Sequence, residues 1–359
     1  FNPEQMRNEM VDFWAVALSP VAINKFFHAV LSGWALAGVF VIGVCGWFML
    51  RGRRREFAVK SMKVGGWIGF VGILLTMWTG HGSAVEVSRT QPMKLAAMEG
   101  LWNGTKGQEL VAFGILNPDK TYDNDADPYL FKIGIPGGLS FLARNDFDAF
   151  VPGISDIIDG VDYAADGSAE PTVSYAERIQ LGKVAHEALR AYDSNDPGAF
   201  GDMDVVHTAL ENTYPYFGYG YLDSPSEAVP PVAMTFYSFH IMVIAGGYLL
   251  AFFAIVMLCL YRCERFLKHR WFQWVCMLTV PVVWICSQAG WVCAEVGRQP
   301  WIIQDLMPTR AAISDISAAS VQLTFWMFAV VFTLLLVAEA SIMLRQISKG
   351  SRQDVELNK

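Results

Sequence analysis

The sequence predicts an all-α membrane protein with five transmembrane helices and a large outward-facing loop domain between the second and the third helix. Of its 359 residues, 53% are apolar and only 17% are charged, whereas a soluble chain usually carries about 25% charged residues. The mean hydropathy is +0.31, and the net charge of −7 leaves no basic footprint for nucleic acid. These values exclude a disordered chain, a nucleic-acid-binding protein and a small secreted domain held by disulfides.

Five apolar runs are long enough to cross a bilayer core, which takes about 20 residues of helix. They cover roughly residues 21–50, 64–85, 229–261, 271–294 and 316–344. Each run is almost free of charged side chains, so we expect each to form one membrane-spanning helix. The few ionisable residues inside these runs are candidates for function, because charge is costly at that depth.

Positive residues in the short connections predict the orientation. They cluster after the first, third and fifth runs, at Arg51–Arg55, at Arg262–Arg270 and from Arg345 onward. If the helices alternate, all three clusters lie on the cytoplasmic side. The predicted parts are an outward N-terminal segment (1–20), helices one and two (21–85), an extracytoplasmic loop (86–228), helices three to five (229–344) and a cytoplasmic tail (345–359).

The predicted loop is acidic. Between His81 and Pro230 there are 23 Asp and Glu residues against 9 Lys and Arg. The spacing of the acidic residues lacks the Gly and the terminal Glu of an EF-hand, so we interpret them as a solvated surface rather than a calcium site. Within the loop, residues 174–192 have the pattern of an amphipathic helix.

Two residues inside the predicted helices could hold an iron atom. His28 lies near the outward end of the first helix, and Met242 lies in the outward half of the third. An imidazole and a thioether together can hold a low-spin haem, and the thioether raises its reduction potential. A hydrogen-bonded packing histidine and a core methionine are the alternatives, and spacing alone does not exclude them.

The fourth predicted helix ends with a second candidate group. Trp291 and Glu295 are four residues apart and share a helix face, and Arg298 follows one turn later. Glu295 could ligate iron, carry protons or pair with Arg298, and Arg298 could bind haem propionates. A salt bridge between Glu295 and Arg298 that caps the helix is the structural alternative.

Four segments resemble subunit I of cytochrome bd-type quinol oxidases. Gly297-Arg-Gln-Pro-Trp301 resembles the GRQPW signature of that family, and Ser287-Gln-Ala-Gly-Trp291 resembles its EAGW stretch. The run from Gln91 to Glu99 is similar to the quinol-binding QPxKxAAxE segment, and the run from Ser19 to His28 is similar to the segment that bears the haem histidine. The segments occur in the order of the family and span nearly the whole chain.

The resemblance implies a role for each matched residue. His28 and Met242 would ligate a low-spin haem b, and Glu295 would ligate a high-spin haem b. Trp291, Arg298 and His240 would form the haem surroundings. Lys94 and Glu99 would lie at the quinol site, where Lys94 hydrogen-bonds a quinol oxygen and Glu99 accepts a proton.

This sequence departs from the family pattern in three ways. His240 replaces an Arg two residues before the methionine ligand, and Gln288 replaces the Glu of the EAGW stretch. The family also has about four further helices before the segment that matches Phe1, and these bear a ligand of the oxygen-reactive haem. We therefore expect a companion polypeptide that carries the missing N-terminal helices, besides a second oxidase subunit.

The resemblance implies a multi-chain quinol:oxygen oxidoreductase of a bacterial or archaeal cytoplasmic membrane. It would oxidise quinol at the outer loop and pass electrons through the low-spin haem to a high-spin site that reduces dioxygen to water. That site would hold a high-spin haem b and a haem d, or a second haem b, shared with the companion chain. A haem-containing quinol dehydrogenase with another acceptor is one alternative, and a membrane transporter or channel is another.

Overall fold

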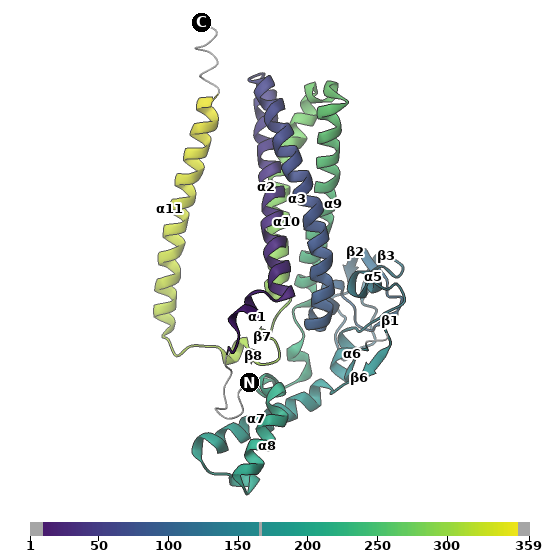
Figure 1. Ribbon diagram of the computed structural model, residues 1–359, viewed down its shortest axis with the longest axis vertical. Coiled ribbons are helices and arrows are strands. Elements are labelled where there is room, and N and C mark those ends of the chain that lie inside the picture. The colour runs from purple at the N-terminus through teal and green to yellow at the C-terminus, as the bar shows by residue number, and fades with distance from the viewer. Residues whose placement is uncertain (1–9, 165–166, 351–359) are drawn as a thin grey trace. The chain divides into compact units, whose positions relative to one another are not determined.

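The computed structural model describes residues 10–164 and 167–350. Residues 1–9 of the predicted N-terminal segment and 351–359 of the predicted tail lie outside this part. Five helices in it are long and apolar enough to cross a membrane, which confirms the predicted class (Figure 1). They are α2 (Pro20–Leu50), α3 (Arg55–Thr90), α9 (Val232–Tyr261), α10 (Arg270–Val296) and α11 (Ala318–Gly350).

The largest difference from the predicted spans is in α3. This helix has 36 residues and extends beyond the apolar run 64–85 at both ends. The additional turns contain Arg, Glu and Lys, which favour helix as strongly as most apolar residues do. The hydropathy pattern therefore predicted only the part of α3 that is apolar enough to cross a bilayer. The polar residues on both sides of it have high helix propensity, so the helix continues beyond the apolar run.

The chain divides into two compact units. One contains the residues up to Val30, Leu75–Ile244 and Ile285–Ala312, and the other contains Leu31–Leu74, Ala245–Trp284 and the residues from Ile313 onward. In the second unit, large apolar side chains from α2, α3 and α9 are fully buried, among them Ile42, Met62 and Phe253. The apolar stretch of α11 has no buried residue, so its side chains are open to lipid or to another chain.

The first unit contains the long loop, which is mainly helical. Its helices are α4 (Pro92–Glu99), α5 (Gly138–Arg144), α6 (Ile154–Asp159), α7 (Tyr175–Ser194) and α8 (Met203–Thr213), and α1 (Phe13–Ala17) precedes α2. Helix α7 confirms the predicted amphipathic helix, and the Ser174 side chain caps it by accepting a hydrogen bond from the Glu177 amide. Short 3₁₀ segments cover Gly198–Phe200, Tyr214–Tyr221, Pro225–Ala228, Glu264–Lys268 and Thr309–Ala311.

The first unit also contains small antiparallel ribbons, which the sequence analysis did not predict. Each pairs two strands: β1 (Thr105–Lys106) with β4 (Phe150–Val151), β2 (Leu110–Leu116) with β3 (Tyr129–Ile135), β5 (Val161–Tyr163) with β6 (Ala169–Pro171), and β7 (Trp301–Ile303) with β8 (Met307–Pro308). The β2–β3 ribbon is the longest, and we call it the hairpin. It stands next to α4 and helps to form the site described below.

Helix α4 lies at the centre of the loop core. Met93 and Ala96 pack in a buried cluster with Trp102, Tyr219 and Trp301, while Leu95 belongs to a second cluster around Leu139. The helix begins with Pro92 at its first turn and ends at Gly100, whose φ of 59° suits glycine. These two residues limit α4 to eight residues, and the two clusters hold it in place.

Candidate functional site

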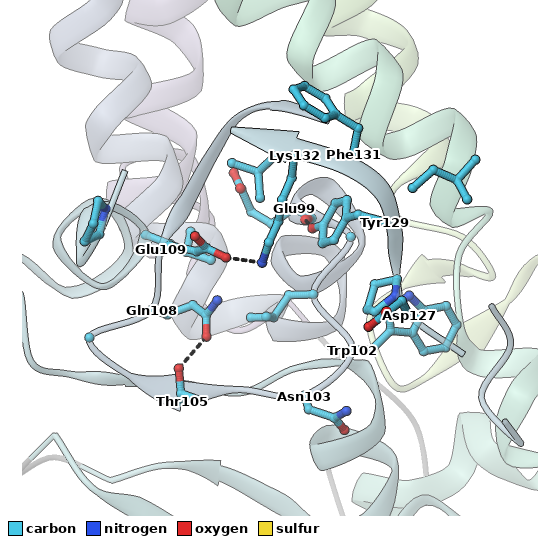
Figure 2. A pocket seen from close by; sticks show the side chains of 18 residues that line it. Glu99, Trp102, Asn103, Thr105, Gln108, Glu109, Asp127, Tyr129, Phe131 and Lys132 are labelled. Carbon is cyan, nitrogen blue, oxygen red and sulfur yellow. Dashed lines mark hydrogen bonds and ion pairs between the residues drawn. The ribbon is translucent and has the colours of Figure 1, made fainter. Parts of the chain in front are cut away.

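The loop side of the first unit contains two cavities that share α4 as a wall. One has a volume of about 410 Å³ and is lined by residues of α2, α3, α4, α9 and α10; we call it the helix cavity. The other has a volume of about 670 Å³ and lies under the hairpin; we call it the hairpin cavity (Figure 2). Both volumes are typical of cofactor and substrate sites.

His28 lines the helix cavity. Its Nδ1 atom lies 3.0 Å from the Thr79 hydroxyl oxygen, which itself lies 3.0 Å from the Leu75 carbonyl oxygen and 3.1 Å from the Thr76 carbonyl oxygen. A hydroxyl that donates to either carbonyl accepts from Nδ1–H, and in that tautomer Nε2 keeps the lone pair that a metal-binding histidine uses.

Met242 lines the same cavity, opposite a glycine. A Cβ atom on Gly290 of α10 would lie 2.8 Å from the Met242 sulfur, which is closer than such atoms normally approach. The missing side chain at Gly290 thus gives the thioether its room. The pairing predicted for His28 and Met242 remains a prediction, but the structure does bring both residues to one cavity.

Cationic side chains surround the remaining part of the helix cavity. Lys25, Lys94 and Arg298 all line it. Lys94 donates a hydrogen bond from Nζ to the Ala294 carbonyl at 2.9 Å, and burial lowers its pKa below the ordinary value for lysine. An imidazole, a thioether and three cations fit a haem, whose propionates need positive partners.

Glu295 also lines the helix cavity, where its carboxylate lies 3.6 Å from the Arg298 guanidinium. This is the salt bridge that the sequence offered as the alternative to iron ligation. Both side chains are partly exposed to solvent, so the pair alone contributes little to stability. The sequence analysis assigned Glu295 to a second haem, whereas the structure places it on the same cavity as His28 and Met242.

Glu99 faces the hairpin cavity and is the most deeply buried carboxyl there. Its side chain is only 1% exposed, and neither of its oxygens accepts a hydrogen bond of good geometry. Burial raises the pKa of Glu99 to about 8, and the nearby Val111 amide lowers that pKa only in part. A carboxyl with such a pKa can take up and release a proton near neutral pH.

The neighbours of Glu99 are polar on the hairpin side (Figure 2). The Tyr129 hydroxyl donates a hydrogen bond to the Glu99 backbone carbonyl, and Lys132 forms an ion pair with Glu109 at the cavity wall. Lys132 also lies 5.3 Å from the centre of the Tyr129 ring. The cavity therefore combines an aromatic wall, an ion pair and one buried acid.

Lys94 and Glu99, which the resemblance assigns to one quinol site, line different cavities, and their shared role remains a prediction. Both stand on α4, but Lys94 lines the helix cavity and Glu99 lines the hairpin cavity. The five-residue spacing turns the two side chains to different sides of a helix with 3.6 residues per turn. The alternative of two surface residues on an interfacial helix fails for Glu99, because it is buried.

Two residues predicted for the haem surroundings do not line the helix cavity. Trp291 is 64% exposed and does not line the helix cavity, because its position on α10 turns it outward. His240 is buried beside the hairpin: its ring nitrogens lie 2.9 Å from the Phe236 carbonyl oxygen and 2.7 Å from the Val111 carbonyl oxygen.

Several residues at the two cavities were missed by the sequence analysis. Thr79 lies in an apolar run, where one hydroxyl carries no functional signal. Tyr129, Lys132 and Glu109 reach the hairpin cavity only through the fold of the loop. Gly290 belongs to the stretch from Ser287 to Trp291 that resembles the family's EAGW, but its contact with Met242 becomes visible only once the pairing of α9 with α10 is known.

A family model and individual relatives of known sequence point to the same protein family. A family model described as "Cytochrome bd terminal oxidase subunit I" matches residues 1–351. Over 357 residues the chain is 31% identical to "Cytochrome bd-II ubiquinol oxidase subunit 1" of Escherichia coli (strain K12), a match that covers 96% of this chain and 65% of the relative. "Cytochrome bd ubiquinol oxidase subunit 1" of Bacillus subtilis (strain 168) is 25% identical, with 99% and 62% covered.

A solved structure shares the fold. The bd oxidase from Geobacillus thermodenitrificans superposes with a TM-score of 0.67 at 21% sequence identity, covering 96% of this chain and 62% of that chain. The chain thus spans slightly less than two thirds of the length of these relatives.

Proposed function

Because the chain belongs to the cytochrome bd terminal oxidase subunit I family, we propose that it is the quinol-oxidising, haem-binding part of a membrane quinol oxidase that reduces dioxygen to water. The observation that carries this proposal is the helix cavity, where an imidazole and a thioether line the same space. Family members are membrane proteins with several spans, and the five long apolar helices agree with that class.

In the proposed oxidase, His28 and Met242 hold a low-spin haem b. When bound there, this haem supplies a one-electron acceptor of raised reduction potential. The His28 ring is oriented by Thr79, and Arg298 and Lys25 neutralise the propionates from the cavity rim. Glu295 is proposed as a ligand of a high-spin haem b, and the companion polypeptide and a second oxidase subunit complete the oxygen site with a haem d or a second haem b.

Glu99 is proposed to accept a proton from quinol in the hairpin cavity. Oxidation of a quinol releases two protons with two electrons, so the site needs a base within hydrogen-bond reach of a ring hydroxyl. The buried carboxyl of Glu99 has no competing donor of good geometry, so its oxygens are free for that bond. Lys94 lines the helix cavity, and we propose that it donates a hydrogen bond to a quinol oxygen there.

The proposed location is the bacterial cytoplasmic membrane, with the loop outward and the C-terminus in the cytoplasm. The support is the positive residues that follow α2, α9 and α11 in sequence. The two cavities would then lie near the outer surface, where released protons leave toward the outside.

Visible spectroscopy of the purified complex tests the proposed function. A reduced-minus-oxidised spectrum should show haem bands, and Met242→Leu and His28→Ala should each abolish the low-spin signal or shift it. Quinol-dependent oxygen consumption should be present in the parent complex. Absence of haem bands would favour the transporter alternative, and quinol oxidation without oxygen consumption would favour the dehydrogenase alternative.

A further inference from the structure

The hairpin presents an apolar face that is not covered by the described part of the chain. In its register, Phe113 pairs with Ile133 and Ile115 pairs with Phe131. Residues directly opposite in an antiparallel pair lie on the same face, and so do residues two apart on one strand. The four side chains therefore share one face, and each is between 43% and 55% exposed. A cluster of this kind marks an interaction surface.

This face carries no charged side chain of the two hairpin strands. Lys132 is the only charged residue in the two strands, and it is opposite Gly114, on the other face of the ribbon. There it pairs with Glu109 at the hairpin cavity. The loop as a whole carries 23 acidic residues between His81 and Pro230, so an uncharged apolar face is a local exception.

One edge of the hairpin is attached to a membrane helix. The Val111 carbonyl accepts a hydrogen bond from His240, and the Leu116 amide donates one to the Tyr237 hydroxyl at 3.1 Å. Both partners are on α9, so α9 side chains satisfy backbone groups at the edge of β2. Tyr237 and Ile241 on α9 are themselves exposed.

The position of these contacts along α9 gives their depth. The helix has 30 residues, which at 1.5 Å per residue gives about 45 Å, the thickness of a bilayer with its headgroup regions. The hydrocarbon core takes about 20 residues, so a core centred on α9 leaves about five residues at each end and places Tyr237 at its edge. Residues 236–240, which hold the hairpin, are then at the boundary between headgroups and hydrocarbon.

We propose that the Phe113/Ile115/Phe131/Ile133 face lies in the bilayer at this boundary and contacts lipid. The free edge of β3 limits how deep the hairpin can lie in the bilayer, because unpaired backbone groups are not tolerated in the hydrocarbon core. The headgroup boundary accepts both those groups and the aromatic rings. The proposal needs only that α9 spans the membrane, and it does not depend on the quinol function.

Spin labelling tests the proposal in the full complex reconstituted in phospholipid bilayers. A nitroxide attached to Ile133→Cys should collide often with oxygen, which concentrates in lipid, and rarely with a water-soluble nickel chelate. The matched control is Val205→Cys, an equally exposed valine on α8 in the same loop. The oxygen-to-nickel collision ratio should be several-fold higher at position 133 than at position 205, after subtraction of the signal from the parent with its native cysteines.

Two results would overturn the proposal. Equal ratios at the two positions would mean that the face is in water, and slow collisions with both reagents at position 133 would mean that a protein subunit covers it. If Ile133→Cys does not assemble, Ile115→Cys reports on the same face. Neither readout uses quinol turnover, so the result stands whether or not the proposed function is correct.

Discussion

Glu99 is a buried acid without a hydrogen-bond donor of good geometry among the described residues. Burying such a group costs free energy unless it is protonated, which is the reason its pKa is raised to about 8. Within the fold this acid is therefore neutral at low pH and becomes a base near pH 8. A site that must collect protons from quinol needs a group with this property.

Glu99→Gln should lower quinol turnover by about 10²-fold or more, because the amide cannot accept the proton. In the parent complex, turnover should rise with pH up to about 8, as the carboxyl loses its proton, and the variant should lack this rise. The measurement is steady-state quinol oxidation from pH 6 to 9, with haem content recorded in parallel. Glu187→Gln on the exposed face of α7 is the control, and an equal loss in both variants would contradict the role of Glu99.

The same carboxyl links stability to pH. Its pKa is about 8 in the fold, against an ordinary value of 4.5, so the folded state holds the extra proton between these two pH values. The free energy of unfolding should therefore fall as pH rises through this range, by up to about 1.4 kcal/mol for each pH unit. Thermal unfolding of Glu99→Gln in detergent should show a weaker fall than the parent.

At the residue scale, the sequence predicted the chemical types of the residues that line the cavities. It did not predict equally well how these residues are grouped. His28, Met242, Glu295 and Arg298 were chosen for their chemistry in or beside apolar helices, and the structure brings all four to one cavity. Lys94 and Glu99 were expected together because the run from Gln91 to Glu99 resembles the quinol-binding segment of the family. Their separation depends on how α4 packs between two clusters, which residue spacing alone does not reveal.

The hairpin and α9 act as one element through His240. Its ring nitrogens lie within hydrogen-bond distance of the Val111 carbonyl of β2 and the Phe236 carbonyl of α9. Val111 also lines the hairpin cavity next to Glu99. We propose that His240 is a positioning residue for the hairpin cavity.

His240→Phe should weaken the attachment of the hairpin, because it removes the ring nitrogen that bonds the Val111 carbonyl while keeping a ring of similar size. The loss for a buried polar pair is about 1–3 kcal/mol. We expect faster hydrogen exchange at Val111–Leu116 and a higher KM for quinol, with an unchanged haem spectrum. His269→Phe, an exposed histidine in the α9–α10 connection, is the control. A haem spectrum that shifts while KM stays constant would return His240 to the haem surroundings.

The pairing of α9 with α10 at Gly290 gives another prediction. Gly290→Ala places a Cβ atom 2.8 Å from the Met242 sulfur, so the thioether must move. The low-spin haem spectrum should shift toward a high-spin or lower-potential form while the helices stay folded. Gly246→Ala is the matched control, since a Cβ there meets nothing within 4 Å. Identical spectra of the two variants and the parent would argue against Met242 as a ligand.

At the element scale, hydropathy predicted the long helices because each is a run of about 20 apolar residues. The amphipathic spacing predicted α7 with an error of one or two residues at each end. The ribbons were missed for a physical reason. β2 has the sequence LVAFGIL, in which apolar residues do not alternate with polar ones, so neither face is marked and the strand cannot be told from a buried helix segment.

The whole molecule leaves much apolar surface for neighbours. The apolar stretch of α11 has no buried residue, and α9 and α10 are buried over less than a quarter of theirs. Because we propose that a companion polypeptide completes the oxidase, the assembled complex is the state in which the Glu295 assignment must be tested.

Glu295→Gln separates the two interpretations of that residue. The salt bridge to Arg298 has a separation of 3.6 Å and is half exposed, so its loss should cost less than about 1 kcal/mol. If Glu295 ligates iron, the high-spin haem b should be missing or spectrally shifted, while the low-spin haem persists. The measurement is the visible spectrum of the complete complex, with Glu187→Gln again as control. An unaltered high-spin spectrum would contradict the proposal that Glu295 ligates iron.

The position of α4 between the two cavities has a consequence for the paths of electrons and protons in the proposed oxidase. A quinol gives up electrons and protons from the same oxygen atoms, yet the two must travel to different destinations. Glu99 stands on one side of this eight-residue helix, and the candidate iron ligands stand on the other. With the proposed roles of these residues, α4 would separate the path of the proton, on the side of Glu99, from the path of the electron, on the side of His28 and Met242.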